Sequence, residues 1–330
     1  MAQLSDVLLQ VAVLVYLAAM MGYLVEFAFG RQGAVARVAA RSELVTAGAP
    51  PSPVSPAPVS ASPVSPVAPG RSGPVAEGRA ARFGAIAVGL SALGLAVHIG
   101  VLVTRGLAAG RVPWGNMYEF VLTLTAVGSL GWLILLSRRP ALRSLGVFVA
   151  AVIMLLLGFA GVVLHTAAEP LMPALNSYWL KIHVTAAATA SGLLLLGFIP
   201  AALFLIRAGY DAGKRRFPYT IGRNLPAADS LERLTFRLHT FAFPIWTLAV
   251  ICGAIWAEAA WGRYWGWDPK ETWSFISWVA YAAYLHARAT PSVKRTTATW
   301  FAVAAWGTML INLYVINFVA VGLHSYAGVK

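Results

Sequence analysis

The stretch SLGVFVAAVIMLLLGFAGVVL at residues 144–164 decides the fold class of this chain. It contains no charged residue, and it supplies the roughly 20 apolar residues that a helix needs to cross a lipid bilayer. The whole chain is 59% hydrophobic and only 11% charged, whereas a soluble domain carries about 25% charged residues. So few charges cannot cover a surface that faces water. The sequence therefore predicts an integral membrane protein.

Further apolar stretches predict an all-α fold, a polytopic membrane bundle of about eight transmembrane helices. The predicted spans run over residues 7–29, 83–104, 117–137, 144–164, 183–207, 240–258, 271–288 and 297–321. The amino-terminal residues lack the positive segment of a cleavable signal peptide, so we expect the first span to be retained. The chain then divides into a first transmembrane helix at 1–30, a linker at 31–82 and a seven-helix domain at 83–330.

The linker at 31–82 is rich in proline, alanine and serine, and it contains PPSPVSPAPVSASPVSPVAP at 50–69. Proline lacks an amide donor, and it disfavours the helical region for the residue before it. The segment also has too little apolar bulk to form a core. We therefore predict a disordered, partly polyproline tether.

The distribution of basic residues predicts the orientation in the membrane. If the amino terminus is outside, most of the 25 lysines and arginines fall on segments that are then cytoplasmic, the linker included. This is the positive-inside pattern of proteins in the plasma membrane. It predicts that both termini and the loop at 259–270 are extracytoplasmic. Because the basic residues form short clusters between spans, the net charge of +13 does not indicate binding to nucleic acid.

Cysteine usage excludes two classes of function. The single cysteine, Cys252, lies inside a predicted span, and the chain has neither a CxxC pair nor a CxxCH haem-attachment motif. It is therefore neither a thiol oxidoreductase nor itself a c-type cytochrome.

Half of the twelve tryptophans fall in the segment 256–278, whose core is WGRYWGWDPKETW at 261–273. An interfacial aromatic belt is the simpler explanation, but a belt spreads its rings over many helix ends. Here the rings share one loop with two glycines, which allow a planar ligand to approach the backbone. The indoles offer broad apolar faces, and two cations could meet carboxylates of a ligand. The candidate ligand-platform residues are Trp261, Arg263, Trp265, Trp267, Asp268 and Lys270.

Two of the six histidines are predicted to lie on the same side of the membrane as this loop. His183 opens the fifth span and His324 follows the last one. Neutral imidazole is a common iron ligand, and two imidazoles can clamp a planar macrocycle from both faces. His286 lies about 15 residues down the seventh span, roughly 22 Å from its start. If His286 binds a ligand, it does so at a second, inner site.

The segment WGRYWGWDPKETWSFISWVAYAAYLHAR at 261–288 resembles the WWD signature of the haem-handling cytochrome c biogenesis proteins of the CcsA/ResC family. Three further segments are similar to that family in order and position: VPWGNMYEF at 112–120, LMPALNSYWLKIHV at 171–184 and VGLHSY at 321–326. The resemblance runs from about Arg82 to the end of the chain and leaves the proline-rich linker outside.

The resemblance implies a role for each of three histidines. His183 and His324 match the external axial ligands of haem b, and His286 matches a membrane-embedded ligand whose partner comes from a second subunit, CcsB/ResB. It further implies that haem is delivered to an apocytochrome c with a CxxCH motif, with a thioredoxin-like thiol reductant as another partner. The haem lyase activity would belong to the complex. His98, His165 and His239 match no ligand of the family, and we expect them to be structural.

Three other functions remain as alternatives. A b-type electron-transfer cytochrome often pairs two histidines within one span, and no predicted span here holds two. A haem or solute transporter without ligation activity often has repeated halves and interrupted helices, which we do not find in the sequence. In a membrane scaffold, the tryptophans would serve only as anchors.

Overall fold

The computed structural model describes residues 1–47, 74–170, 177–320 and 322–324, and every element of regular secondary structure over these residues is a helix. This confirms the predicted fold class. The α-helices are α1 (Ala2–Ala47), α2 (Pro74–Ala109), α3 (Met117–Arg138), α4 (Gly146–Val163), α5 (Tyr178–Asp211), α6 (Ala228–Trp261), α7 (Pro269–Ala289), α8 (Arg295–Leu310) and α9 (Ile316–Val319). Two short 3-10 turns, η1 (Pro140–Leu145) and η3 (Tyr219–Asn224), and one π-helical turn, η4 (Ile311–Val315), connect or extend them.

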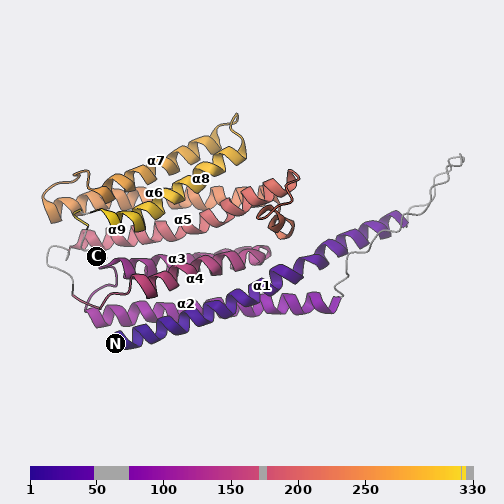
Figure 1. Ribbon diagram of the computed structural model, residues 1–330, viewed down its shortest axis with the longest axis horizontal. Coiled ribbons are helices and arrows are strands. Elements are labelled where there is room, and N and C mark those ends of the chain that lie inside the picture. Colours follow the sequence, from indigo (N-terminus) through magenta and orange to yellow (C-terminus); the bar gives the residue numbers. More distant parts are fainter. Residues whose placement is uncertain (48–73, 171–176, 321, 325–330) are drawn as a thin grey trace, which may run out of the picture.

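Seven helical segments within the described residues are long and apolar enough to cross a membrane, so the protein is a multi-pass membrane protein. The predicted span at 271–288 corresponds to α7, which is not among the seven. With 21 residues, α7 is about 31 Å long and could cross a bilayer. It falls short in hydropathy, because serine, tyrosine, tryptophan and charged end residues take the place of aliphatic side chains. It nevertheless packs along α6 and α8 in the bundle (Figure 1).

The helices on either side of the predicted linker reach into it. α1 continues to Ala47, and α2 begins at Pro74. Helical backbone therefore covers both ends of the segment 31–82. The proline-rich stretch at 50–69, on which the prediction of a disordered tether rests, lies outside the described residues.

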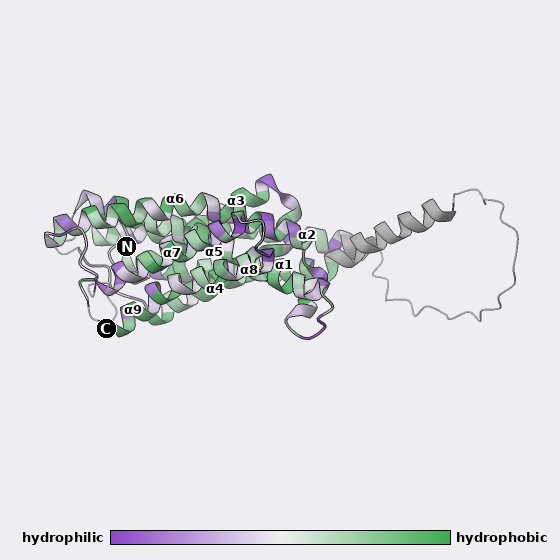
Figure 2. Ribbon diagram, turned by 90° about the horizontal axis from the view of Figure 1, so that it is seen from above, coloured by the Kyte–Doolittle hydropathy of each residue, from purple (hydrophilic) through white to green (hydrophobic). Residues whose placement is uncertain are grey.

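The helices alternate in direction, so connections that are far apart in the sequence gather at one end of the bundle (Figure 1). The start of α1, the loops at 110–116 and 262–268, and the end of α9 lie there. The turn η3 lies at the opposite end. Figure 2 shows apolar residues along the length of the helices, and polar residues concentrated toward the two ends. The carboxyl-terminal residues 325–330 lie outside the described part of the chain.

Candidate functional site

A large pocket opens at the end of the bundle where the tryptophan-rich loop lies. It contains about 1240 Å³ of space not filled by atoms, its open mouth included. Ligand pockets in proteins are lined mainly by apolar and aromatic groups. The same holds here, with walls from α3, α5, α6, α7 and α8. Eight of the lining residues are aromatic: Trp114, Phe120, Trp246, Trp256, Trp261, Tyr264, Trp265 and Trp306.

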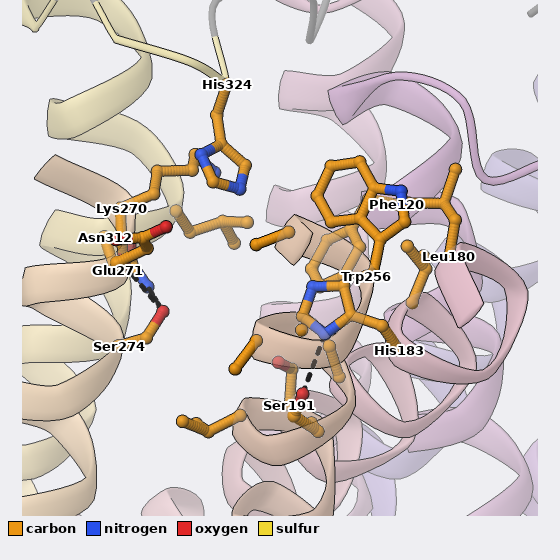
Figure 3. Close-up of a pocket in the computed structure, with 18 of the residues that line it drawn as sticks. Phe120, Leu180, His183, Ser191, Trp256, Lys270, Glu271, Ser274, Asn312 and His324 are labelled. Atoms are coloured by element: carbon orange, nitrogen blue, oxygen red, sulfur yellow. Dashed lines mark hydrogen bonds between the residues drawn. The ribbon is translucent and has the colours of Figure 1, made fainter. Parts of the chain in front are cut away.

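His183 projects into this pocket from the second turn of α5 (Figure 3). Its Nδ1 lies 2.8 Å from the carbonyl oxygen of Ala249 in α6. A carbonyl only accepts hydrogen bonds, so Nδ1 carries the proton and Nε2 carries the lone pair. The ring stacks on Trp256, with centroids 6.1 Å apart and planes 9° apart. Gly253 makes room for it, since a Cβ there would lie 2.7 Å from the imidazole.

His324 enters the same pocket from the opposite wall (Figure 3). Its Nδ1 lies 2.9 Å from Oδ1 of Asp268, and Oδ2 of that carboxylate accepts a bond of 2.7 Å from the Leu323 amide. The His324 ring also contacts Trp256 and Trp261 edge-on, at 5.9 and 5.1 Å between centroids. A carboxylate on the second ring nitrogen is the arrangement that orients a metal-binding histidine.

Asp268 is nearly buried, and its surroundings keep it ionised. Burial alone would raise the pKa of this carboxyl, but the hydrogen bond from His324 and the backbone bonds from Leu323 and Lys270 outweigh that effect and lower the pKa. The carboxylate therefore stays charged at neutral pH and can accept a hydrogen bond from the N–H group at His324 Nδ1.

A network of hydrogen bonds holds the loop at 262–268 in one shape. Gly262 ends α6 in the left-handed conformation, at φ 70°, which suits a glycine. Asp268 caps the start of α7, and Oε2 of Glu271 accepts bonds from the amides of Asp268 and Gly266. Trp267 also has a positive φ, 57°, a conformation that is rare for a bulky residue. Such strain is found mostly where a surrounding structure fixes a functional loop.

The predicted platform residues fall into two groups. Trp261, Trp265 and Lys270 line the pocket together with the two histidines, and Asp268 stands behind His324. Arg263 and Trp267 instead lie on the exposed side of the loop. Arg263 packs over Gly266, where any Cβ would clash with its guanidinium.

Lys270 supplies a cation to a largely apolar pocket. Burial lowers the pKa of its ammonium group to about 8, although the neighbouring Asp268 carboxylate acts against this shift. Its Nζ lies 3.9 Å from the Met117 sulfur. An ammonium group that is poorly solvated in this way gains most from an anionic ligand.

His286 is exposed near the far end of α7 and does not line this pocket. The structure thus places it apart from His183 and His324. The three histidines that we expected to be structural also lie outside the pocket. His98 is fully buried beside Tyr16, His165 contacts Asp6, and Nδ1 of His239 donates to the Thr235 carbonyl oxygen. Among the described residues, no group of three or more His, Cys, Asp or Glu is placed to hold a bare metal ion.

Sequence reasoning missed the wall that precedes and begins α3. Trp114, Met117 and Phe120 line the pocket, although we had quoted their segment without assigning them a role. This wall is anchored by Glu119, which is 0% exposed and pairs with Arg111 at 2.6 Å and with Arg105 at 3.1 Å. A carboxylate inside an apolar stretch, flanked by arginines, was the available signal.

Three polar residues that line the pocket were also missed. Glu271, Ser274 and Asn312 lie together on one wall (Figure 3), and Asn312 Nδ2 donates to Ser274 Oγ at 3.0 Å. Asn312 lies in the π-helical turn η4, and such turns occur often at functional sites.

Fold and site together define a multi-pass membrane protein with a two-histidine, aromatic-walled pocket at one end of its bundle. Comparison with known proteins places it more closely. The family described as "Cytochrome C assembly protein" matches residues 114–324. The cytochrome c biogenesis protein CcsA of Guillardia theta is 35% identical over 242 residues, covering 68% of this chain and 80% of that protein. CcsA of Gloeobacter violaceus is 31% identical over 291 residues, covering 72% and 84%.

This chain therefore belongs to the cytochrome c assembly protein family, and it is a CcsA-family cytochrome c biogenesis protein. Membership of this family implies haem handling. The matched region begins at Trp114 and ends at His324, so it contains every residue that lines the pocket. The helices α1 and α2 lie outside it.

Proposed function

We propose that the protein binds haem b in this pocket, between His183 and His324, and presents it to an apocytochrome c. One observation carries the proposal: both imidazoles enter one cavity, and each Nδ1 is held by an oxygen acceptor. Each ring therefore directs its lone-pair nitrogen, Nε2, to ligand binding. Two neutral imidazoles are suitable axial ligands for haem iron, so the donor set fits the substrate.

The remaining pocket groups suit the other parts of the substrate. The indoles of Trp256, Trp261 and Trp265 offer apolar surface to a planar ring. Lys270 lines the pocket, where its ammonium group could form an ion pair with a haem propionate. This ion pair would also stabilise the charged form of the lysine. Trp267 and Arg263, on the exposed side of the loop, are available to the incoming apocytochrome or to a second propionate.

The attachment chemistry needs positioning more than acid–base catalysis. Each cysteine thiol of the CxxCH segment adds across a vinyl group: a carbon–sulfur bond forms, the vinyl double bond becomes single, and the thiol proton ends on the neighbouring carbon. No electrons are gained or lost, but both cysteines must be reduced, which calls for a thiol-reducing, thioredoxin-like partner. The CxxCH histidine then replaces one axial ligand. The protein's part is to hold the substrate and control its ligation.

The pocket end of the bundle is proposed to face the outside of the plasma membrane. The opposite end carries a cluster of exposed cations in Lys214, Arg215 and Arg216, as the positive-inside rule requires. A variant lacking Cys252 and carrying one cysteine at position 263 tests this. An impermeant maleimide should label it in intact cells; labelling only after lysis would reverse the orientation.

His286 is proposed to serve a second, inner haem site. It is exposed near the end of α7 remote from the pocket, so a ligand there needs residues from another chain. A membrane subunit of the CcsB/ResB type would supply them, and the haem lyase activity would belong to the complex. No observation favours a b-type electron-transfer cytochrome, a solute transporter or a scaffold over this function.

Haem spectra of purified variants test the central proposal. In a His286→Ala background, which removes the proposed inner ligand, the double variant His183→Ala plus His324→Ala should lose the absorbance of bis-imidazole haem, while His165→Ala, a histidine at the same end but outside the pocket, should keep it. Retention of that spectrum by the double variant would refute axial ligation at this site. The spectra are recorded on the protein co-purified with the partner subunit. They are recorded again with His286 intact, which shows how much absorbance the inner site contributes.

A further inference from the structure

The buried face of α7 is polar along most of its length. Glu271, Ser274, Ser277, Tyr281 and Tyr284 follow one another at intervals of three or four residues, which places them on one side of the helix. Ser277 and Tyr281 are 0% exposed, and Tyr284 is 1% exposed. A helix that packs inside an apolar bundle normally buries aliphatic side chains, so this face requires another explanation.

Neighbouring helices add polar groups to the same face. From the last transmembrane segment, Thr308 donates to Ser277 Oγ at 3.0 Å, and Asn312 donates to Ser274 Oγ at 3.0 Å. From α6, the ring of His239 lies against two tyrosines, 5.4 Å from Tyr281 and 5.0 Å from Tyr284 between centroids. We call this set the polar seam; its members are Glu271, Ser274, Ser277, Tyr281, Tyr284, Thr308, Asn312 and His239.

Four buried atoms of the seam have no hydrogen-bond partner within the part of the chain that the structure describes. They are Oε1 of Glu271, Oδ1 of Asn312, the hydroxyl of Tyr281 and Nε2 of His239. Unpaired atoms of this kind are usually satisfied by buried water. Along α7, the direct bonds at Ser274 and Ser277 lie between the unpaired atoms of Glu271 and Tyr281, and water molecules would bridge the gaps on either side.

The seam connects the pocket with the other half of the bundle. Its first members, Glu271 and Asn312, line the pocket (Figure 3). Its last, Tyr284, lies 13 residues further along α7, a rise of about 20 Å. Beyond it, Arg288 and Glu232 form an ion pair that is partly exposed at the far end. The chain of polar groups thus covers most of the apolar thickness of a bilayer.

We propose that the polar seam, with bridging water, conducts protons between the pocket and the opposite end of the bundle. Carboxylate and imidazole groups accept and release protons, while hydroxyls and water relay them. No other species moves, so each proton that enters at one end leaves at the other. Packing alone does not account for the seam: hydroxyl and amide groups join helices by bonding to one another, yet Tyr281 and His239 point unpaired atoms at the interior.

Proton flux into vesicles tests the proposal without any bound haem. The full-length protein is reconstituted into liposomes that contain a pH-sensitive dye, and a potassium diffusion potential is imposed with valinomycin. We expect wild-type vesicles to acidify faster than protein-free vesicles. The variant Tyr281→Phe removes one hydroxyl and retains the ring, and Glu271→Gln removes the carboxylate; each should slow the flux on the order of tenfold.

A matched control separates the seam from general damage. Thr299 is a buried hydroxyl residue of α8 that bonds its own helix and lies nine residues, or two and a half turns, before Thr308. It therefore faces the other way, and Thr299→Val should leave the flux unchanged. Wild-type flux equal to that of empty vesicles would refute the proposal, as would a Tyr281→Phe variant that elutes as a single species and conducts at the wild-type rate. Loss of haem binding would not affect either outcome.

Discussion

Replacing Asp268 by asparagine tests whether the carboxylate beside His324 supports iron binding. Oδ1 of Asp268 lies 2.9 Å from His324 Nδ1, and its other oxygen accepts the Leu323 amide at 2.7 Å. Asparagine is as good a helix N-cap as aspartate, so α7 should still begin at the same residue. The substitution mainly removes the negative charge that orients the imidazole and increases its basicity.

The expected effects on binding and on folding differ in size. Loss of a carboxylate behind a metal-binding histidine lowers affinity about 10–100-fold, which corresponds to about 1.4–2.7 kcal/mol. The amide oxygen of asparagine can still accept the backbone bonds of the cap. We therefore expect the free energy of unfolding to fall by no more than about 1 kcal/mol.

Absorbance titration of the purified protein with haem measures the first effect, and thermal unfolding in detergent measures the second. Asp211→Asn is a matched control, because Asp211 pairs with Arg207 on an exposed part of α5 at the opposite end of the bundle. A variant at Asp268 that binds haem as tightly as the wild type would overturn the argument that this carboxylate supports a ligand. Equal loss in both variants would show that the effect is not specific to the pocket.

Three further changes test the pocket and its supports. Glu119→Gln leaves Arg105, which is 1% exposed, without its counter-charge; the free energy of unfolding should fall by about 3 kcal/mol, as measured by denaturation in detergent. Burial lowers the pKa of Lys270 to about 8, so the side chain is charged below that pH. The haem affinity of the wild type should therefore fall as the pH rises through 8. Haem titrations of Lys270→Met over the same pH range should show no such step. Trp267→Gly removes the strain of a positive φ at the expense of an exposed ring contact; stability should change by less than about 1 kcal/mol, while covalent haem in a co-expressed cytochrome c should fall.

Most of the fold could be predicted because apolar runs of span length have few structural alternatives. The helix ends were predicted less well. α6 begins at Ala228, twelve residues before the predicted start of its span at 240. Residues 228–239 include several charged side chains, so the apolar run that marks the span begins only at 240, although the helix has already begun at Ala228. α7 differs in another way. It is long enough to be a span, but it buries a polar face, so its mean hydropathy is too low to identify it as one.

The candidate site could be predicted only in part. His183, His324 and the loop at 262–268 could be placed together, because the number of spans between them puts all three at the same end of the bundle. The wall around Trp114 was missed: Glu119 and its arginines marked the segment, but which of its side chains face the pocket depends on packing between distant segments. Asn312 could not be predicted as a pocket residue, because it lies in a π-helical turn. Such a turn shifts the helical register, so the side chains on the pocket face do not follow a period of 3.6 residues.

Glu271 belongs both to the pocket loop and to the polar seam, and its two carboxylate oxygens have different hydrogen-bonding environments. Oε2 accepts hydrogen bonds from the amides of Gly266 and Asp268, which keep the loop in shape, while Oε1 has no partner among the described residues. A proton that arrives on Oε1 leaves Oε2 as a carbonyl-type acceptor, so both amide bonds can persist. The loop that holds Asp268 against His324 therefore keeps its geometry in either protonation state. Proton transfer at Glu271 and ligand binding at His324 can thus take place on the same short segment without disturbing one another.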